Sequence, residues 1–226
     1  MRIIDLSPPI GPGTPGWPGD QPFDARLRWG IADGESVNVQ TVTTSAHLGS
    51  HIDAPFHVDP DGAGIEGVPL DACVGDCLVL DVHGLLSQDG TTAGFAPAAE
   101  VRERIGSLLS VAGDAAGRAP VERLLLRHRS APPAQWDPGM PGLDPELVEW
   151  FGAQGGRLLG IDLDSFDPTD SKDLPAHHAA LKHGVVILEG LDLGPAPEGV
   201  SGLIALPVPW VGADAAPVRA VLRVQD

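Results

Sequence analysis

Residues 177–189 read HHAALKHGVVILE, and this stretch decides the fold class. Its first half is typical of a helix that ends at Gly184, and its second half is an apolar run typical of a buried strand. A helix that leads directly into such a strand is typical of α/β proteins. The run ends at Glu189, whose carboxylate is costly to bury unless it binds a metal or pairs with a cation such as an arginine.

The same patterns extend the α/β prediction over the rest of the chain. Helices are expected at about 97–109, from the N-cap Asp144 and Pro145 to Gly155, and at about 173–183. Eight segments suit strands. They are Arg2–Leu6, Val37–Thr43, Cys77–Val82, Arg123–Arg127, Arg157–Leu163, Val185–Glu189, Gly202–Pro207 and Val218–Val224.

Two segments between these elements stand out. Prolines and glycines exclude regular structure from Ser7–Phe23, SPPIGPGTPGWPGDQPF, which we expect to be a stiff loop. The stretch Gln88–Pro120 is rich in Ala and Gly and is interpreted as a surface excursion that carries one helix. No repeat or charge block divides the chain, so residues 1–226 are predicted to form a single α/β domain.

The composition limits the class of partner. The 226 residues include 31 acidic and 14 basic side chains, which gives a net charge of −17. Nucleic-acid binding is therefore not expected, because phosphate contacts need Lys and Arg. Because 42% of the residues are hydrophobic, the chain can bury a sizeable core. We expect a small-molecule substrate as the main partner.

The sequence also indicates a compartment. Its start, MRIIDLSPP, lacks the features of a signal peptide, and no run approaches the roughly 18 apolar residues of a membrane span. A soluble, cytoplasmic protein without a membrane partner is expected. The two cysteines, Cys73 and Cys77, could form half of a metal site, but no second pair exists and buried reduced thiols are favoured.

The segment His47–His57, HLGSHIDAPFH, carries the chemistry. Its three histidines and one aspartate are ligand types for zinc-like metals, which bind imidazole nitrogen and carboxylate oxygen. An extended strand would hold His47 and His51 about 13 Å apart, so a turn between them is needed to bring both to one ion. The same turn would let Asp53 approach, and Pro55 would redirect the chain so that His57 faces the site. The alternative is a set of histidines scattered in a polar loop.

A second donor segment is expected at residues 177–189. Glu189 and one of the adjacent residues His177 and His178 could complete a two-metal site, and the pattern does not choose between the two histidines. His183, in the last helical turn, is interpreted as a helix-end cation. Two ions bridged by carboxylates would activate water for hydrolysis, and His57 would then be free to accept and return its proton.

These residues resemble the metal-dependent cyclase family, most closely its kynurenine formamidase (arylformamidase) branch of tryptophan breakdown. The similarity covers most of the chain and rests on three blocks in order. They are DLSPPIGPGTPGWPGDQPF, HLGSHIDAPFH followed by DPDGAGIEGVPLD, and GIDLDSFDPTDSKDLPAHHAALKHGVVILEGL. The resemblance implies an amidohydrolase that uses water to cleave N-formyl-L-kynurenine into L-kynurenine and formate.

The resemblance also assigns residues and a fold. By position, His47, His51 and Asp53 would bind one ion, and Asp53, His177 and Glu189 would bind the second. The family places its histidine twelve residues before its glutamate, which selects His177 over His178. His57 would be the catalytic acid and base, and Trp17 would contact the substrate. The resemblance further implies a mixed, barrel-like sheet flanked by helices (the swivelling β/β/α type), a homodimer, and two zinc ions per subunit, with manganese as an alternative.

Some positions depart from the family pattern. The excursion at 88–120 is long, His128 stands where threonine is usual, and Leu163 and Asp164 replace a Thr-Pro pair. A second hypothesis therefore keeps the metal site but takes a cyclic amide, imide or lactone as substrate, as isatin hydrolases do. A third is a calcium-binding structural protein, suggested by an acidic run whose spacing does not follow a calcium loop. The run is Asp162, Asp164, Asp167, Asp170 and Asp173.

Overall fold

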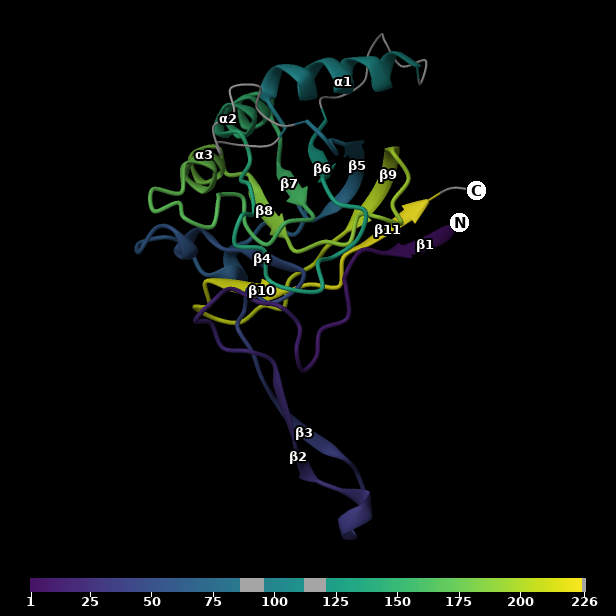
Figure 1. Ribbon diagram of the computed structural model, residues 1–226, viewed down its shortest axis with the longest axis vertical. Coiled ribbons are helices and arrows are strands. Elements are labelled where there is room, and N and C mark those ends of the chain that lie inside the picture. The colour runs from purple at the N-terminus through teal and green to yellow at the C-terminus, as the bar shows by residue number, and fades with distance from the viewer. Residues whose placement is uncertain (86–95, 112–120, 225–226) are drawn as a thin grey trace.

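The computed structural model describes residues 1–85, 96–111 and 121–224, in which a curled, mixed sheet is the main element (Figure 1). Its nine strands run in the order β1-β11-β9-β5-β6-β7-β8-β4-β10. They are β1 (Arg2–Asp5), β4 (His51–Asp53), β5 (Val74–Asp81), β6 (Arg123–Arg127), β7 (Leu158–Ile161), β8 (Val186–Glu189), β9 (Gly199–Ile204), β10 (Ala215–Pro217) and β11 (Val221–Val224).

The centre of the sheet is parallel and its flanks are antiparallel. Strands β5, β6, β7 and β8 pair in parallel, and one helix crosses over between each consecutive pair. These helices are α1 (Ala98–Val111), α2 (Pro145–Ala153) and α3 (Pro175–His183), which lie along one side of the sheet in Figure 1. The prediction of an α/β domain with a barrel-like mixed sheet and flanking helices is confirmed.

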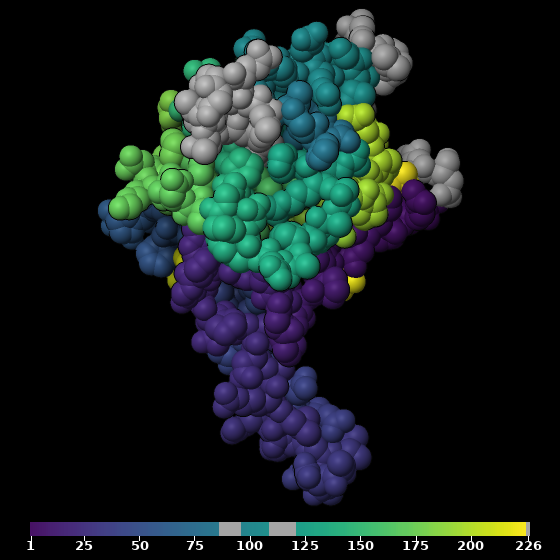
Figure 2. All heavy atoms as spheres, in the orientation of Figure 1, coloured from purple at the N-terminus to yellow at the C-terminus, as the bar shows by residue number. Residues whose placement is uncertain are grey.

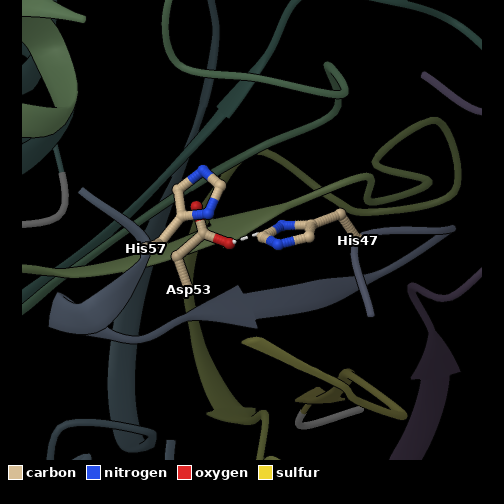
Figure 3. A group of neighbouring side chains, drawn as sticks. All are labelled: His47, Asp53 and His57. Atoms are coloured by element: carbon tan, nitrogen blue, oxygen red, sulfur yellow. Dashed lines mark ion pairs between the residues drawn. The ribbon is translucent and has the colours of Figure 1, made fainter. Parts of the chain in front are cut away.

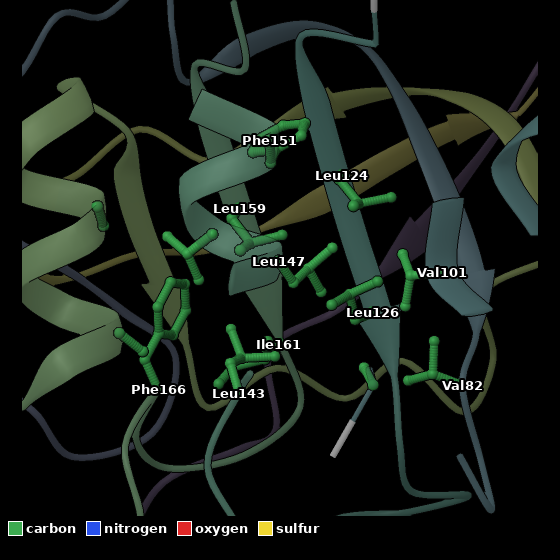
Figure 4. Packing of buried hydrophobic residues seen from close by; sticks show 14 of the residues in the cluster. Val82, Val101, Leu124, Leu126, Leu143, Leu147, Phe151, Leu159, Ile161 and Phe166 are labelled. Atoms are coloured by element: carbon green, nitrogen blue, oxygen red, sulfur yellow. The ribbon is translucent and has the colours of Figure 1, made fainter. Parts of the chain in front are cut away.

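Buried side chains fill both faces of the central strands. In β6, Leu124 and Leu126 face the helices while Leu125 faces the concave side, and none of the three is exposed to solvent. Figure 4 shows the first of these layers, in which Leu147 and Phe151 of α2 pack over the sheet. Burial on both faces explains why these strands have continuous apolar sequences rather than alternating ones.

The pairing of β4 with β8 positions the candidate site. The two strands are antiparallel, and their register sets His51 opposite Glu189 and Asp53 opposite Ile187. On the other side of β4, Ala215 of β10 lies opposite Asp53. The segments around residues 50 and 189, which are distant in the sequence, therefore meet in the sheet.

A two-stranded hairpin projects from the body of the molecule (Figures 1 and 2). Its strands, β2 (Asp24–Trp29) and β3 (Val39–Thr43), form a separate sheet with each other. Between them lies the short 3-10 helix η1 (Ile31–Asp33). We call residues 24–43 the arm.

Each of the eight expected strands overlaps an observed one, but three observed strands were not predicted. They are β2, β4 and β10, and the last two have only three residues each, too few for a periodic pattern. Ser7–Phe23 has no helix or strand, as expected. The third helix begins at Pro175 rather than near Asp173, because Leu174 adopts a left-handed conformation (φ 41°) that no helix continues through.

Other predictions have mixed outcomes. Cys73 and Cys77 are free and buried, and burial raises their pKa values to about 11 and about 12. Residues 88–95 and 112–120 of the expected excursion lie outside the described residues. Its described part, residues 96–111, contains α1. Within the described part of the chain, the helices lack the length and apolar character that crossing a membrane requires.

Asp144 connects the first two helices, which yields a test of the fold. Its Oδ1 accepts a hydrogen bond from the N–H of Glu146 in α2, as expected for an N-cap, and its Oδ2 accepts one from the N–H of Ala98, the first residue of α1. Asp144→Ala should lower the free energy of unfolding by about 1–2 kcal/mol, the usual range for a lost cap. Urea denaturation measures this loss, and the exposed Asp170→Ala is the matched control. Equal stability of the two variants would contradict the double cap.

Candidate functional site

The segment His47–His57 forms the turn that the metal hypothesis requires. Residues 46–50 turn, His51–Asp53 form β4, and Pro55–His57 form a 3-10 helix that redirects the chain. Because residues two apart on a strand face the same side, His51 and Asp53 lie together while Ile52 points into the core. The four candidate side chains of this segment therefore gather within one short loop and strand.

Glycines allow the two donor segments to touch. Gly190, directly after Glu189, has φ +65°, and a Cβ atom there would lie 2.2 Å from the carbonyl oxygen of Gly49. The hydroxyl of Ser50 donates to the carbonyl oxygen of Gly190 at 2.9 Å, which joins the same two segments. A side chain at position 190 would push Glu189 away from His51. The close approach of the backbones at Gly49 and Gly190 therefore keeps Glu189 near His51.

Five of the candidate ligands surround one point. The Oδ1 atom of Asp53 lies 3.1 Å from Nδ1 of His47 and 3.4 Å from Nε2 of His51. Its Oδ2 atom lies 3.5 Å from Nε2 of His177. Glu189 closes the group, with Oε2 3.3 Å from Nε2 of His51 and Oε1 3.6 Å from Nε2 of His177. Asp53 thus lies against all three of these histidines.

The donor atoms fit a bound cation. Nε2 of His51 and both carboxylate oxygens of Asp53 are buried and make no hydrogen bond within the described part of the chain. Buried polar atoms are normally paired, so three such atoms at one point indicate a missing partner. Imidazole nitrogens and carboxylate oxygens are the ligands of zinc and similar divalent metals.

The geometry divides the donors into two overlapping groups. In one, ligand atoms of His51, Asp53 and Glu189 lie within 4.8 Å of one another, and in the other those of His47, Asp53 and His57 do so. Figure 3 shows the second group, in which the side chains of His47, Asp53 and His57 converge and a dashed line joins Asp53 to His47. Both groups share Asp53, which suits a bridging carboxylate. His57 is also close enough to act as a ligand, a role that differs from the predicted one.

The structure separates the histidines of α3. His177 is buried against Asp53 and Glu189, whereas the adjacent His178 is exposed. His183 forms an ion pair with Glu149 at 2.7 Å, near the end of the helix and apart from the site. The partners of Glu189 are His51, His177 and the N–H of Phe166, so it does not depend on an arginine.

A buried aspartate that was not singled out as a site residue orients His177. Oδ2 of Asp167 lies 2.6 Å from Nδ1 of His177 and accepts the N–H of the same residue, while Oδ1 accepts the N–H of Ala176. This leaves Nε2 of His177 directed to the site, an arrangement common behind metal-binding histidines. Asp167 belongs to the acidic run on which the calcium hypothesis rested. Its carboxylate is buried and contacts His177 and the backbone N–H groups of α3 instead of facing solvent. Asp162 of that run likewise accepts backbone N–H groups, from His128 and Arg129.

Mutual attraction shifts the pKa values of the site. Burial by itself lowers the pKa of an imidazole, but the carboxylates around His177 outweigh it and raise its pKa to about 10. Asp53 and Glu189 also raise the pKa of His51 well above its usual value, against the effect of burial. Asp53 and Asp214 raise the pKa of His47. The three histidines lower the pKa of Asp53 well below its usual range against the effect of burial. The surrounding carboxylates therefore favour the protonated form of these three histidines.

A cavity of about 330 Å³ opens onto the donors. Its wall includes His57, whose side chain is 30% exposed, and Asp214, whose Oδ2 lies 3.6 Å from Nδ1 of His57 and 3.0 Å from Nε2 of His47. Trp17 also lines it and contacts Trp136 edge-on, with 5.0 Å between ring centroids. Neither Asp214 nor Trp136 was predicted, because a single aspartate or tryptophan in a loop carries no spacing signal.

Comparisons with known proteins agree with this architecture. The sequence profile of the family described as Putative cyclase matches residues 4–168. A solved structure described as a potential metal-dependent hydrolase with cyclase activity has a TM-score of 0.73 and 24% identity, covering 99% of each chain. A predicted metal-dependent hydrolase from Bacillus stearothermophilus has a TM-score of 0.72 and 24% identity, covering 98% of this chain and 97% of that one. Isatin hydrolase A from Labrenzia aggregata has a TM-score of 0.74 and 22% identity, covering 100% and 94%.

The role of Asp167 can be tested by metal affinity. Asp167→Asn should weaken zinc binding by about 10–100-fold, the usual effect of losing the partner of a metal-binding histidine. The exposed Asp170→Asn is the matched control, because it changes the same chemical group in the same loop. Competition with a fluorescent chelator measures both affinities. Unchanged affinity in Asp167→Asn would show that this hydrogen bond does not orient a ligand.

The raised histidine pKa values predict that protons leave when a metal binds. A histidine protonated at neutral pH must lose its proton to become a ligand, so metal affinity should fall as the pH falls. The expected change is about tenfold per pH unit for each proton displaced. Calorimetric titration of the metal-free protein with zinc, in buffers of different ionisation enthalpy, counts the released protons. Release of none at pH 7 would contradict the pKa assignment.

Proposed function

This chain belongs to the cyclase family, and from that premise we propose that it is a metal-dependent amidohydrolase that converts N-formyl-L-kynurenine to L-kynurenine and formate. The observation that carries the hydrolytic part is the convergence of His47, His51, Asp53, His177 and Glu189 on one point. Three of them, His47, His177 and Glu189, line an open cavity. Unpaired buried donor atoms at that point support a bound cation. These residues would hold two zinc ions, with Asp53 common to both donor groups and with manganese as the alternative metal.

Bound divalent ions would supply Lewis-acid activation of water and of the substrate carbonyl. The chain itself supplies a proton acceptor. His57 stands at the cavity wall, where it can take a proton from the attacking water and give it to the leaving nitrogen. The formyl C–N bond breaks as the water oxygen joins the formyl carbon, and formate and the free amine are released. Asp214, 3.6 Å from Nδ1 of His57, is placed to stabilise the imidazolium that exists between the two transfers.

The wall of the cavity supports an aromatic substrate with a cationic group. Trp17, in contact with Trp136, offers an apolar surface in the cavity wall for an aniline ring. Asp20 and Asp164 also line the cavity, and their carboxylates suit the α-ammonium group of formylkynurenine. Asp164 is one of the positions where this chain departs from the kynurenine formamidase pattern. A contact between Asp164 and the ammonium group would therefore be particular to this sequence.

The second candidate is hydrolysis of a cyclic amide such as isatin. It is favoured by the similarity to two isatin hydrolase structures, one from Labrenzia aggregata and one bound to the product analogue thioisatinate. Isatin would use the same metal centre and the same aromatic wall. It has no ammonium group, so it would gain nothing from Asp20 and Asp164.

A paired assay on one sample tests the proposal. The purified protein, with its metal content measured, should hydrolyse N-formyl-L-kynurenine with a higher kcat/KM than isatin. A chelator should abolish the activity, and zinc or manganese should restore it. Full activity without metal would refute metal dependence, while turnover of isatin alone would favour the second candidate. Inactivity toward both substrates in the metal-loaded protein would remove both assignments.

His57→Ala separates the two roles that the geometry allows for His57. As the acid and base, its loss should lower kcat by about 10²-fold or more while the metal content stays the same. As a ligand, its loss should lower the metal content. His178→Ala, which changes an exposed histidine next to the site, is the control and should alter neither quantity. Unchanged turnover in His57→Ala would exclude His57 from the mechanism.

A further inference from the structure

Leu174 has a backbone conformation that its sequence disfavours. Its φ and ψ angles are 41° and 54°, in the left-handed region, and among the described non-glycine residues only Ala96 also has a positive φ. A leucine is strained there, because its Cβ atom crowds the carbonyl oxygen that follows. Pro175 adds to the strain, since a residue before proline favours extended backbone. Strain that a fold retains often marks a functional position.

Polar side chains on both sides hold this strained turn. The hydroxyl oxygen of Ser171 accepts the N–H of Leu174 at 3.2 Å. Just beyond, the carboxylate of Asp167 accepts the N–H groups of Ala176 and His177, both at 3.0 Å. Helix α3 begins directly after Leu174, so the turn that strains this residue also presents His177 to the candidate metal site.

The strain at Leu174 is not explained by packing in the core. Leu174 belongs to neither of the two buried hydrophobic clusters of the described chain. Its side chain instead lines the cavity that opens onto the candidate metal site. Most of the side chains in that wall are ionisable, and the apolar ones among the described residues are Pro15, Trp17 and Leu174. Leu174 is thus one of few apolar contacts that the cavity offers to a substrate.

We propose that Leu174 is a specificity-determining residue, presented to the cavity by the strained turn so that it contacts the aromatic ring of the substrate. This inference rests on the proposed function for the place of the substrate and adds a residue that selects the ring. In N-formyl-L-kynurenine and in isatin alike, the bond to be cleaved joins a carbonyl carbon to a nitrogen carried by the ring. The ring therefore lies beside the metal centre in both cases, where Trp17 and Leu174 favour an aryl amide over an alkyl amide.

Two substitutions separate the contact from the strain. Leu174→Asn keeps a side chain of similar shape and relieves the strain, since asparagine adopts the left-handed conformation more readily, but it makes this part of the wall polar. Leu174→Met keeps an apolar, adaptable side chain and the strain. Urea denaturation should show that Leu174→Asn is at least as stable as the wild type, although it loses the contact with the ring.

The probe for the contact is 2-aminoacetophenone, which has the aniline ring of kynurenine and no amide bond to hydrolyse. In the zinc-loaded protein, NMR titration should give a dissociation constant about tenfold higher for Leu174→Asn than for the wild type, the effect of losing roughly two methylene groups of apolar contact. Leu174→Met should stay within about threefold of the wild type. Leu70→Asn, at a position 60% exposed and outside the cavity, is the matched control and should bind as the wild type does.

Kinetics provide a second readout. With whichever of N-formyl-L-kynurenine and isatin the wild type hydrolyses, Leu174→Asn should raise KM by about tenfold and leave kcat and the zinc content unchanged, as expected for a contact made equally before and during the reaction. A loss of kcat with KM unchanged would contradict a contact of this kind.

The outcomes distinguish this inference from the proposed function. Failure of the wild type to bind the probe, unchanged affinity in Leu174→Asn, or an equal loss in Leu174→Met would each overturn the role of Leu174. A Leu174→Asn variant that loses stability in parallel with affinity would show that the residue is merely structural. Inactivity of the wild type toward both substrates would instead refute the proposed function, and the pattern of probe binding would still decide whether Leu174 contacts the ring.

Discussion

The register between β4 and β8 is the constraint on which the site depends. It sets His51 opposite Glu189, and the alternation of the strand then brings Asp53 to the same side. The central parallel strands make this register possible, since their apolar faces hold β8 in place between the two buried layers. Helix α3, which crosses over to β8, delivers His177 to the same point. One pairing thus assembles candidate ligands that lie more than 120 residues apart in the sequence.

Interactions between buried ionisable groups dominate this site. Asp53 and the histidines that lie 3.1–3.5 Å from it each shift the other's pKa toward the charged form. Such a cluster is costly to bury unless a strong opposite charge balances it, and both carboxylate oxygens of Asp53 make no hydrogen bond within the described residues. Asp167 and Asp214 extend the network outward, one behind His177 and one between His47 and His57. The surrounding chain is acidic as well, which favours cations in and around the cavity.

The sequence predicted the elements with strong local signals. The apolar runs of β5 to β8 and the cap at Asp144 were recognisable, and so was the turn between His47 and His51, since ligand spacing required it. The strands β4 and β10 could not be predicted, because three residues have no period and their pairing is a long-range property. Asp167 and Asp214 could not be recognised as site residues either, because their contacts with His177 and His47 follow from the fold and not from sequence spacing. Choosing His177 over His178 needed either the resemblance or the burial that the structure gives.

The contact between Gly49 and Gly190 has a consequence for how chains of this kind can change in length. A residue inserted between His47 and Asp53 would shift β4 by one position and turn its ligands toward the core, and the close backbone approach leaves no slack to absorb it. A substitution on β4 leaves the register unchanged, whereas an inserted or deleted residue reverses which side chains face the site. The strands of the arm pair only with each other, so a change of length there leaves the register of β4 and its candidate ligands unchanged.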